Sequence, residues 1–240
     1  DETHWWCVGM RAIVYDLLEM HVARGGRLRV LDAGCGGGTL VRRLQERHFA
    51  VGVDLFPVAL RYARGRGAHE LAGGSLDALP FVAESFDAAL CLDVLYHIGL
   101  GDSRRALAEL RRVLRPGGWL LVRQPAYAWL RGSHDGWLGT QRRMTIGQLR
   151  AELERAGFVV PRATYANTLL FPAAALWRLG QRYGLLEERV GEPAGDLIPP
   201  AAALNRFLTA LLGLERRFLR WGNLPFGVSA LALAQKPLDG

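Results

Sequence analysis

The sequence is poor in lysine and cysteine. Lys236 is the only lysine among its 30 basic residues, and Cys7, Cys35 and Cys91 are its only cysteines. No two cysteines form a C-x-x-C pair or a metal-spaced set with histidines, so we expect no metal site and no redox dithiol. Three widely separated cysteines also argue against a disulfide framework and indicate a reducing, cytoplasmic setting.

Long apolar runs are absent too. The longest uncharged stretch, residues 163–177, is shorter than the roughly 20 residues that a transmembrane helix needs, and it contains Pro172. The first residues also lack the pattern of a secretory signal. We therefore expect a cytoplasmic protein, for which peripheral contact is the only route to a membrane.

Hydrophobic residues make up 50% of the 240 residues, enough for one sizeable core, so we expect a single domain over 1–240. The formal net charge is +7. The arginines are spread along the chain without a long basic block. This distribution favours a general preference for arginine in the composition as the source of the charge. An anionic substrate, a nucleic acid or an anionic membrane is the alternative explanation.

The hydrophobic pattern predicts alternating strands and helices after a leading helix at 9–23. The expected strands are 28–31, 51–53, 69–72, 86–92, 119–122 and 158–164, and the expected helices are 38–48, 57–64, 103–114 and 145–156. This alternation indicates a mostly parallel sheet covered on both faces. A long loop is expected at 123–144.

The alternation stops near residue 166. Two apolar helices, 173–183 and 200–221, are expected around a Gly-Pro-rich segment, and a last strand at 227–235. We therefore divide the domain into an N-terminal lid and helix (1–27), a cofactor-binding core (28–165), a helical insertion or cap (166–226), and a final strand with its tail (227–240).

A glycine-rich turn, V-L-D-A-G-C-G-G-G at 30–38, follows the first buried strand. Glycines let the backbone approach a ligand, and the next helix directs its free N–H groups at it. Dinucleotide-binding proteins use the same device, but Thr39 stands at their third glycine position and Asp32 would repel a pyrophosphate. Asp54, after the second strand, is placed to accept both hydroxyls of a ribose.

Together with S-L-D-A-L-P-F at 75–81 and L-R-R-V-L-R-P-G-G at 110–118, these motifs resemble the class I S-adenosylmethionine-dependent methyltransferases of the type 11 group, over roughly residues 28–164. The resemblance implies an α/β fold with a Rossmann-like sheet of seven mostly parallel strands, the last antiparallel, and helices on both faces. It also implies S-adenosylmethionine as cofactor and S-adenosylhomocysteine as product.

The same motifs imply a cofactor site. They assign Gly34 and Gly36 to the methionine portion, Asp54 and Leu55 to the ribose, Leu76, Asp77 and Ala78 to the adenine, and Leu92 and Asp93 to the edge of the site. Asp32 suits an amine or hydroxyl donor. Cys35 belongs to the turn itself, and we interpret both Cys35 and Cys91 as packing residues.

The N-terminus, His4-Trp5-Trp6 with Arg11, resembles the H-W-W-F-x-x-R-R start of a bacterial subset of these enzymes, from which Cys7 and Met10 depart. Aromatic faces attract a sulfonium, and an arginine can bind a carboxylate. We interpret Trp5 and Arg11 as part of a lid over the cofactor. The alternative is that the tryptophans only cover the sheet edge.

The residues that bind and deprotonate the methyl acceptor are expected after the fourth and fifth strands, 86–92 and 119–122. His134, oriented by Asp135, and His97 are the candidate general bases. The candidate acceptor-binding residues are Tyr96, Tyr127, Trp137, Arg142 and Arg143, of which the arginines suit a phosphate or carboxylate. The alternatives are packed histidines and arginines that pair with surface acids.

The predicted function is methyl transfer to an oxygen of a small-molecule, glycosylated or lipid-linked acceptor, with a homodimer or peripheral membrane contact formed by the insertion. A nucleic-acid methyltransferase is the alternative, although no N-P-P-Y-like motif replaces Cys91-Leu92-Asp93-Val94. A catalytically silent cofactor-binding scaffold and a nicotinamide-dependent dehydrogenase are the other rivals.

Overall fold

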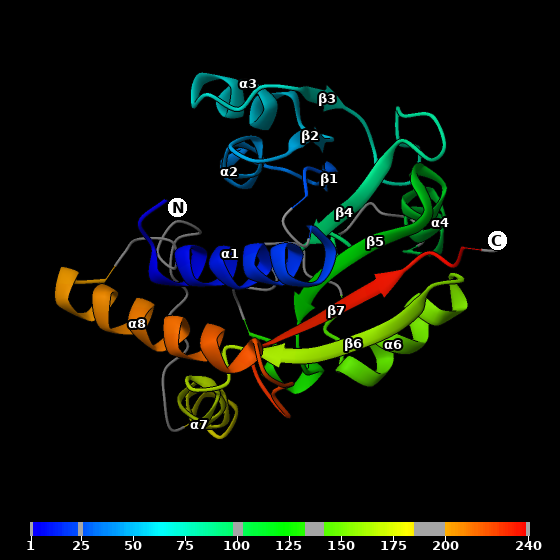
Figure 1. Cartoon of the computed structure of the whole chain (residues 1–240). Helices are drawn as coiled ribbons and strands as arrows, with labels where there is room; N and C mark the ends of the chain where they lie inside the picture. Colours follow the sequence, from blue (N-terminus) through cyan, green and yellow to red (C-terminus); the bar gives the residue numbers. More distant parts are fainter. Residues whose placement is uncertain (1, 24–25, 98–102, 133–141, 185–199, 239–240) are drawn as a thin grey trace.

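The computed structural model describes residues 2–23, 26–97, 103–132, 142–184 and 200–238. In these ranges seven strands form one sheet in the spatial order β3-β2-β1-β4-β5-β7-β6 (Figure 1). The first five strands pair in parallel, and β7 is antiparallel to both β5 and β6. The strands are β1 Arg29–Ala33, β2 Phe49–Asp54, β3 Leu71–Gly73, β4 Phe86–Leu92, β5 Leu114–Pro125, β6 Val159–Ala166 and β7 Ser229–Gln235.

Helices alternate with the strands as the sequence predicts. They are α1 Trp5–Leu18, α2 Thr39–Gln45, α3 Pro57–Gly65, α4 Ser103–Val113, α6 Ile146–Arg155, α7 Phe171–Arg182 and α8 Ala202–Leu219, with the π-helical turn η1 Glu19–Ala23 and the 3₁₀ turn η2 Ala128–Leu130. The expected α/β sheet with an antiparallel last strand is confirmed. None of the helices in the described parts of the chain is both long and apolar enough to span a bilayer.

Both faces of the sheet bury apolar side chains, because successive residues of a strand point to opposite faces. In β1, Val30 belongs to a core shared with α1, α2 and α8. The next residue, Leu31, belongs to a second core shared with α4 and α6. Helices therefore cover both faces, as expected.

Several element boundaries differ from the prediction, and two of the differences bear on the site. Helix α1 begins at Trp5, before the expected residue 9, because the His4 side chain caps it by accepting a hydrogen bond from the Trp6 N–H (3.3 Å). Strand β5 extends beyond 119–122 to Pro125 because its last residues pair with β7. The connection to α6 is therefore shorter than the predicted loop, and η2 lies within it.

The segment that the sequence predicts as a helical insertion contains α7 and α8, and these two helices have different neighbours. Helix α8 runs beside α1 (Figure 1), where Asp16 of α1 accepts hydrogen bonds from Arg216 (2.7 Å) and Arg220 (2.7 Å). Helix α7 lies instead near η2, with the Phe171 and Trp129 rings 6.0 Å apart. The insertion therefore extends the core around α1 with one helix and borders the end of β5 with the other.

Glu215 of α8 connects the two parts of the insertion. Glu215 is 1% exposed, and its carboxylate accepts hydrogen bonds from the backbone N–H groups of Asn167, Thr168 (2.7 Å) and Leu169 (3.3 Å), at the turn before α7. Burial raises the pKa of Glu215, and the three N–H donors oppose that shift.

We expect Glu215→Ala to lower the free energy of unfolding by about 3 kcal/mol, because several buried N–H donors lose their acceptor. Urea denaturation of the purified protein measures this loss. Glu154→Ala is the matched control, since Glu154 is an exposed helical glutamate. An equal loss in both variants would show that the Glu215 contacts add nothing specific.

Candidate functional site

Three aspartates lie at the carboxyl edge of the parallel strands. Asp32 belongs to the end of β1, Asp54 ends β2, and Asp93 follows β4 directly. The strand order changes direction between β1 and β4. In open α/β sheets, the crevice at such a switch point is where ligands bind. The topology therefore brings the cofactor carboxylates predicted from sequence to one edge.

The turn after β1 depends on its glycines. Gly34, Gly36 and Gly38 all have positive φ, at 86°, 50° and 72°. A Cβ on Gly34 would lie 2.4 Å from the Val94 side chain, whereas one on Gly36 would meet no atom within 4 Å. Gly34 and Gly38 are therefore required for packing, and Gly36 leaves open space beside the backbone.

Asp54 holds this turn in place. Its Oδ2 accepts the Gly36 N–H (2.8 Å) and its Oδ1 accepts the Phe56 N–H (2.9 Å). Each carboxylate oxygen has a second lone pair, so both can still accept a hydroxyl. Asp54 is 8% exposed, and its neighbour Leu55 is 60% exposed.

Asp32 is buried, at 4% exposure, and no residue in the described ranges donates a hydrogen bond to its carboxylate. Burial and the Asp54 carboxylate raise the pKa of Asp32 to about 7, while the Arg123 guanidinium opposes the rise. A buried carboxylate without a donor fits a cationic or hydrogen-donating ligand group.

Arg123 of β5 is a site residue that the sequence reasoning missed. It is 7% exposed, donates to the Asp93 carboxylate through Nε (2.8 Å), and stacks 4.9 Å from the Trp6 ring centroid. Asp93 itself has a left-handed φ of 56°, a conformation that is uncommon in non-glycine residues but that aspartate adopts more readily than most. In the sequence, the only indication of this role was that a charged residue directly follows the expected apolar strand 119–122.

The N-terminal segment is anchored near the glycine turn. The Trp5 N–H donates to Asn205 Oδ1 of α8 (2.9 Å), and Glu2 pairs with Arg42 of α2 (2.8 Å). Arg11 lines a cavity of about 460 Å³ together with Thr39 at the start of α2. This places Arg11 beside the first turn of α2. One face of Trp6 is covered by Arg123.

The predicted adenine loop is held by helix α4. Leu76 is buried, Asp77 is half-buried and Ala78 is exposed. Glu109 accepts the Leu79 N–H (2.8 Å), and Arg112 donates to the Leu79 carbonyl (3.1 Å). The i,i+3 pair Glu109–Arg112 thus fixes the loop after Asp77, a role that its motif did not reveal.

The predicted acceptor residues are only partly brought together. His97 is half-buried beside Tyr96, with ring centroids 4.7 Å apart. Tyr127, at a positive φ of 53°, stacks on Tyr165 (5.2 Å). Burial and the Tyr165 hydroxyl raise the pKa of Tyr127. Three further predicted residues lie outside the described residues: His134, Asp135 and Trp137.

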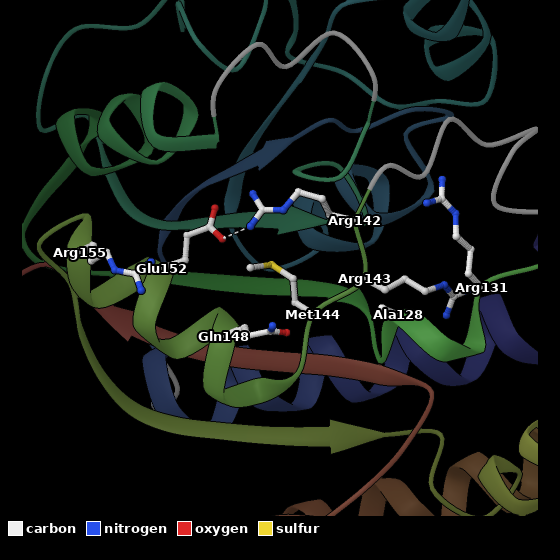
Figure 2. Close-up of a pocket in the computed structure, with 8 residues that line it drawn as sticks. All are labelled: Ala128, Arg131, Arg142, Arg143, Met144, Gln148, Glu152 and Arg155. Carbon is white, nitrogen blue, oxygen red and sulfur yellow. Dashed lines mark hydrogen bonds and ion pairs between the residues drawn. The ribbon is translucent and has the colours of Figure 1, made fainter.

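Arg142 and Arg143 line a cavity of about 480 Å³ with Ala128, Arg131, Met144, Gln148, Glu152 and Arg155 (Figure 2). Arg142 pairs with Glu152 (3.3 Å), and Arg143 donates to the Ala126 carbonyl (3.2 Å). The two arginines predicted to bind the acceptor therefore share one cavity.

The cysteines carry no nucleophilic signature. Cys7, Cys35 and Cys91 are free and buried. Burial raises the pKa of Cys35 to about 12 and also raises that of Cys91, which disfavours a thiolate. Across the described ranges, no group of three or more His, Cys, Asp or Glu residues is arranged to hold a metal ion.

The residues at this edge fit S-adenosylmethionine, the cofactor that the motifs imply. Asp32 suits the ammonium of its methionine portion, Gly36 leaves room against the backbone, and Asp54 keeps acceptor capacity for the ribose hydroxyls. A pyrophosphate would meet the two buried carboxylates of Asp32 and Asp54, which argues against a dinucleotide.

Comparison with known proteins gives a consistent result. Residues 31–122 match the model of a methyltransferase domain family. A probable S-adenosylmethionine-dependent methyltransferase of Mycolicibacterium smegmatis is 31% identical over 82% of this chain and 74% of its own length. The malonyl-[acyl-carrier protein] O-methyltransferase of Erwinia pyrifoliae is 33% identical over 65% of this chain and 61% of its own length, so the chain spans less than two thirds of that relative.

Among solved structures, an S-adenosylmethionine-dependent methyltransferase from Thermotoga maritima superposes with a TM-score of 0.57 at 18% identity. The superposition covers 97% of this chain and 93% of that one. The likeness extends the shared fold beyond residues 31–122, to nearly the whole chain.

We expect Gly36→Ala to weaken S-adenosylhomocysteine binding at least tenfold, because the new methyl group would occupy the open space at the glycine turn. The free energy of unfolding should fall by only about 1 kcal/mol, the cost of a left-handed backbone in alanine. Isothermal titration calorimetry and urea denaturation measure the two effects. Gly184→Ala is the matched control, since Gly184 also has a positive φ (68°) and open surroundings. Unchanged affinity in Gly36→Ala would contradict this placement of the cofactor.

Proposed function

The chain belongs to the S-adenosylmethionine-dependent methyltransferases, and on that premise we propose that it transfers a methyl group to an oxygen of a small-molecule, glycosylated or lipid-linked acceptor. The observation that carries the proposal is the Asp32 carboxylate, buried without a hydrogen-bond donor in the described ranges beside the turn that Asp54 holds. This arrangement suits the ammonium and ribose ends of the cofactor.

When bound, S-adenosylmethionine supplies an electrophilic methyl group on a sulfonium. The protein's part is to align acceptor and cofactor and to take a proton from an acceptor hydroxyl. His97, half-buried next to Tyr96 after β4, is the described histidine nearest in sequence to the Asp93 edge. We propose His97 as one candidate base, and His134, with Asp135, as the other.

Two observations support the acceptor class. The Erwinia pyrifoliae relative is an O-methyltransferase. A lipid-linked acceptor is also supported by exposed apolar side chains near the end of α8. Phe218 and Trp221 are exposed and adjoin the exposed Arg217 and Arg220 in sequence, and Phe207 is exposed earlier in the same helix. Such a combination suits contact with an amphipathic molecule.

The direct test of the cofactor assignment is calorimetry with S-adenosylhomocysteine and NAD in parallel. The proposal requires binding of the former and no comparable binding of the latter. Turnover is then measured as transfer of labelled methyl from S-adenosylmethionine to fractionated small-molecule, lipid and nucleic-acid pools. Label in the nucleic-acid pool alone would replace our acceptor class, and cofactor binding without transfer to any pool would indicate a scaffold.

We expect S-adenosylhomocysteine affinity to fall about tenfold when the pH is lowered from 8 to 6. Asp32, with its pKa raised to about 7, is protonated over this range and loses its attraction for the ligand ammonium. Asp32→Asn should bind more weakly and show a flat profile. Calorimetry at several pH values measures both, and a slope that persists in Asp32→Asn would assign the titration to another group.

We expect His97→Gln to lower turnover about a hundredfold while S-adenosylhomocysteine affinity stays within about twofold, because a base acts on the acceptor and not on the cofactor. His69→Gln, a change of an exposed histidine, is the control. If turnover is unchanged in His97→Gln but falls in His134→Ala, His134 is the base instead.

A further inference from the structure

The Arg123 guanidinium has hydrogen-bond donors that its contacts within the protein leave unused. Its Nε (2.8 Å) and its Nη2 both donate to Oδ2 of Asp93. No residue in the described ranges accepts a hydrogen bond from the third nitrogen, Nη1. Arginine carries N–H donors on all three of these nitrogens, so both N–H groups of Nη1 are available to a ligand.

Arg123 and Asp32 lie on the same face of the sheet. Asp32 of β1 pairs with Leu90 of β4, and Leu90 pairs with Leu121 of β5. Leu90 and Leu121 both belong to the core that α1, α2 and α8 share. Arg123 is two residues beyond Leu121, and alternate residues of a strand point to the same face. Both charged side chains therefore lie on the face that α1 covers.

The strand register also sets how far apart the two residues are. Asp32 and Arg123 are two strands apart and offset by two residues along the strands. With a strand spacing of about 4.8 Å and a rise of about 3.3 Å per residue, their Cα atoms are about 12 Å apart. The long arginine side chain covers part of this gap. In agreement, the guanidinium is close enough to oppose the rise of the Asp32 pKa.

Asp32 and Arg123 therefore offer opposite charges at one edge of the sheet. Asp32 is buried and has no hydrogen-bond donor in the described ranges, while Arg123 keeps its Nη1 donors. The ligand group that matches such a pair is a zwitterion. An α-amino acid is one, because its ammonium and its carboxylate are attached to the same carbon. The methionine portion of S-adenosylmethionine ends in this group.

We propose that Arg123 binds the α-carboxylate of the cofactor through Nη1 while Asp32 binds the α-ammonium. The inference rests on the proposed function and adds to it a cofactor-binding residue outside the sequence motifs. Hydrogen bonds between a guanidinium and a carboxylate are among the strong ones in proteins. The ion pair with Asp93 and the stacking on Trp6 (4.9 Å) hold the guanidinium in place before the ligand binds.

Arg11 is the alternative residue for the carboxylate, because the N-terminal motif suggests such a role. Its Nη2 donates to the Glu2 carbonyl (3.4 Å), and it lines the cavity of about 460 Å³ with Thr39 of α2. The residues that line this cavity do not include Asp32. Arg123 shares a sheet face with Asp32, so the register favours Arg123.

The test compares three ligands by isothermal titration calorimetry with the full chain. They are S-adenosylhomocysteine, its decarboxylated analogue, which keeps the ammonium, and 5′-methylthioadenosine, which lacks the whole amino-acid end. We expect Arg123→Gln to weaken S-adenosylhomocysteine binding at least tenfold and to change the other two affinities by less than about twofold, because only the first ligand has a carboxylate. Arg123→Lys should recover part of the loss, since it keeps the charge without the fork.

Asp32→Asn examines the other half of the pair. It should weaken S-adenosylhomocysteine and the decarboxylated analogue, which both carry the ammonium, and leave 5′-methylthioadenosine unchanged. Arg115→Gln is the matched control for Arg123→Gln, because Arg115 is also an arginine of β5 that pairs with an aspartate, Asp87 (2.7 Å). It should leave all three affinities unchanged.

An equal loss for all three ligands in Arg123→Gln would assign Arg123 to the fold of the site and overturn the proposal. Binding of 5′-methylthioadenosine by the variant shows that its site is folded. A selective loss of S-adenosylhomocysteine in Arg11→Gln but not in Arg123→Gln would assign the carboxylate to Arg11. If the unmodified chain binds none of the three ligands, the proposed function fails. If it binds S-adenosylhomocysteine and Arg123→Gln binds it equally well, only the role of Arg123 fails.

Discussion

The burial of Asp32 within electrostatic range of Asp54 is the constraint on which the cofactor edge depends. Two carboxylates at the ends of adjacent strands are costly to bury. The structure offsets this cost unequally. Asp54 receives two backbone N–H groups from Gly36 and Phe56, whereas Asp32 has no donor in the described ranges and its pKa rises to about 7. Asp54 therefore stabilises the turn, and Asp32 is left with a charge that a cationic ligand group can balance. We therefore propose that both carboxylates face the cofactor, and that Asp54 in addition holds the turn.

Arg123 extends this constraint to the N-terminus. It opposes the rise of the Asp32 pKa, binds Asp93, and stacks on Trp6 of α1. Helix α1 in turn depends on α8, through the Asp16 ion pairs and the bond from Trp5 to Asn205. Glu215 connects the same helix α8 to the turn before α7, whose Phe171 packs against Tyr127, a residue that the sequence predicts to contact the acceptor. Helix α8 thus contacts both α1 and the turn that precedes α7.

The sequence was sufficient to locate those site features that are defined by residues close together in the chain. The glycine turn, Asp32 and Asp54 are defined by residues next to a strand end, so the motif fixes their positions once the strand is known. Arg123 is different, because its role in the site depends on contacts with Asp93 and Trp6 and on the pairing of β5 with β7. These partners are all distant from Arg123 in sequence. The same holds for Glu215, whose three donors precede it by more than 45 residues. A hydrophobic pattern identifies the buried face of α8, but it does not say that a glutamate on that face accepts the N–H groups of another turn.

The turn after β4 is tied to the glycine turn by direct contacts. The Asp93 N–H donates to the Arg123 carbonyl (2.8 Å), and the Arg123 guanidinium donates to the Asp93 carboxylate, so the start of this turn is bound to β5. The His97 N–H donates to the Val94 carbonyl (3.0 Å). Val94 in turn lies so close to Gly34 that a Cβ on the glycine would be 2.4 Å from it. A side chain at position 34 would therefore displace the turn that holds His97, so the absence of a side chain there sets how closely the proposed base approaches the glycine turn.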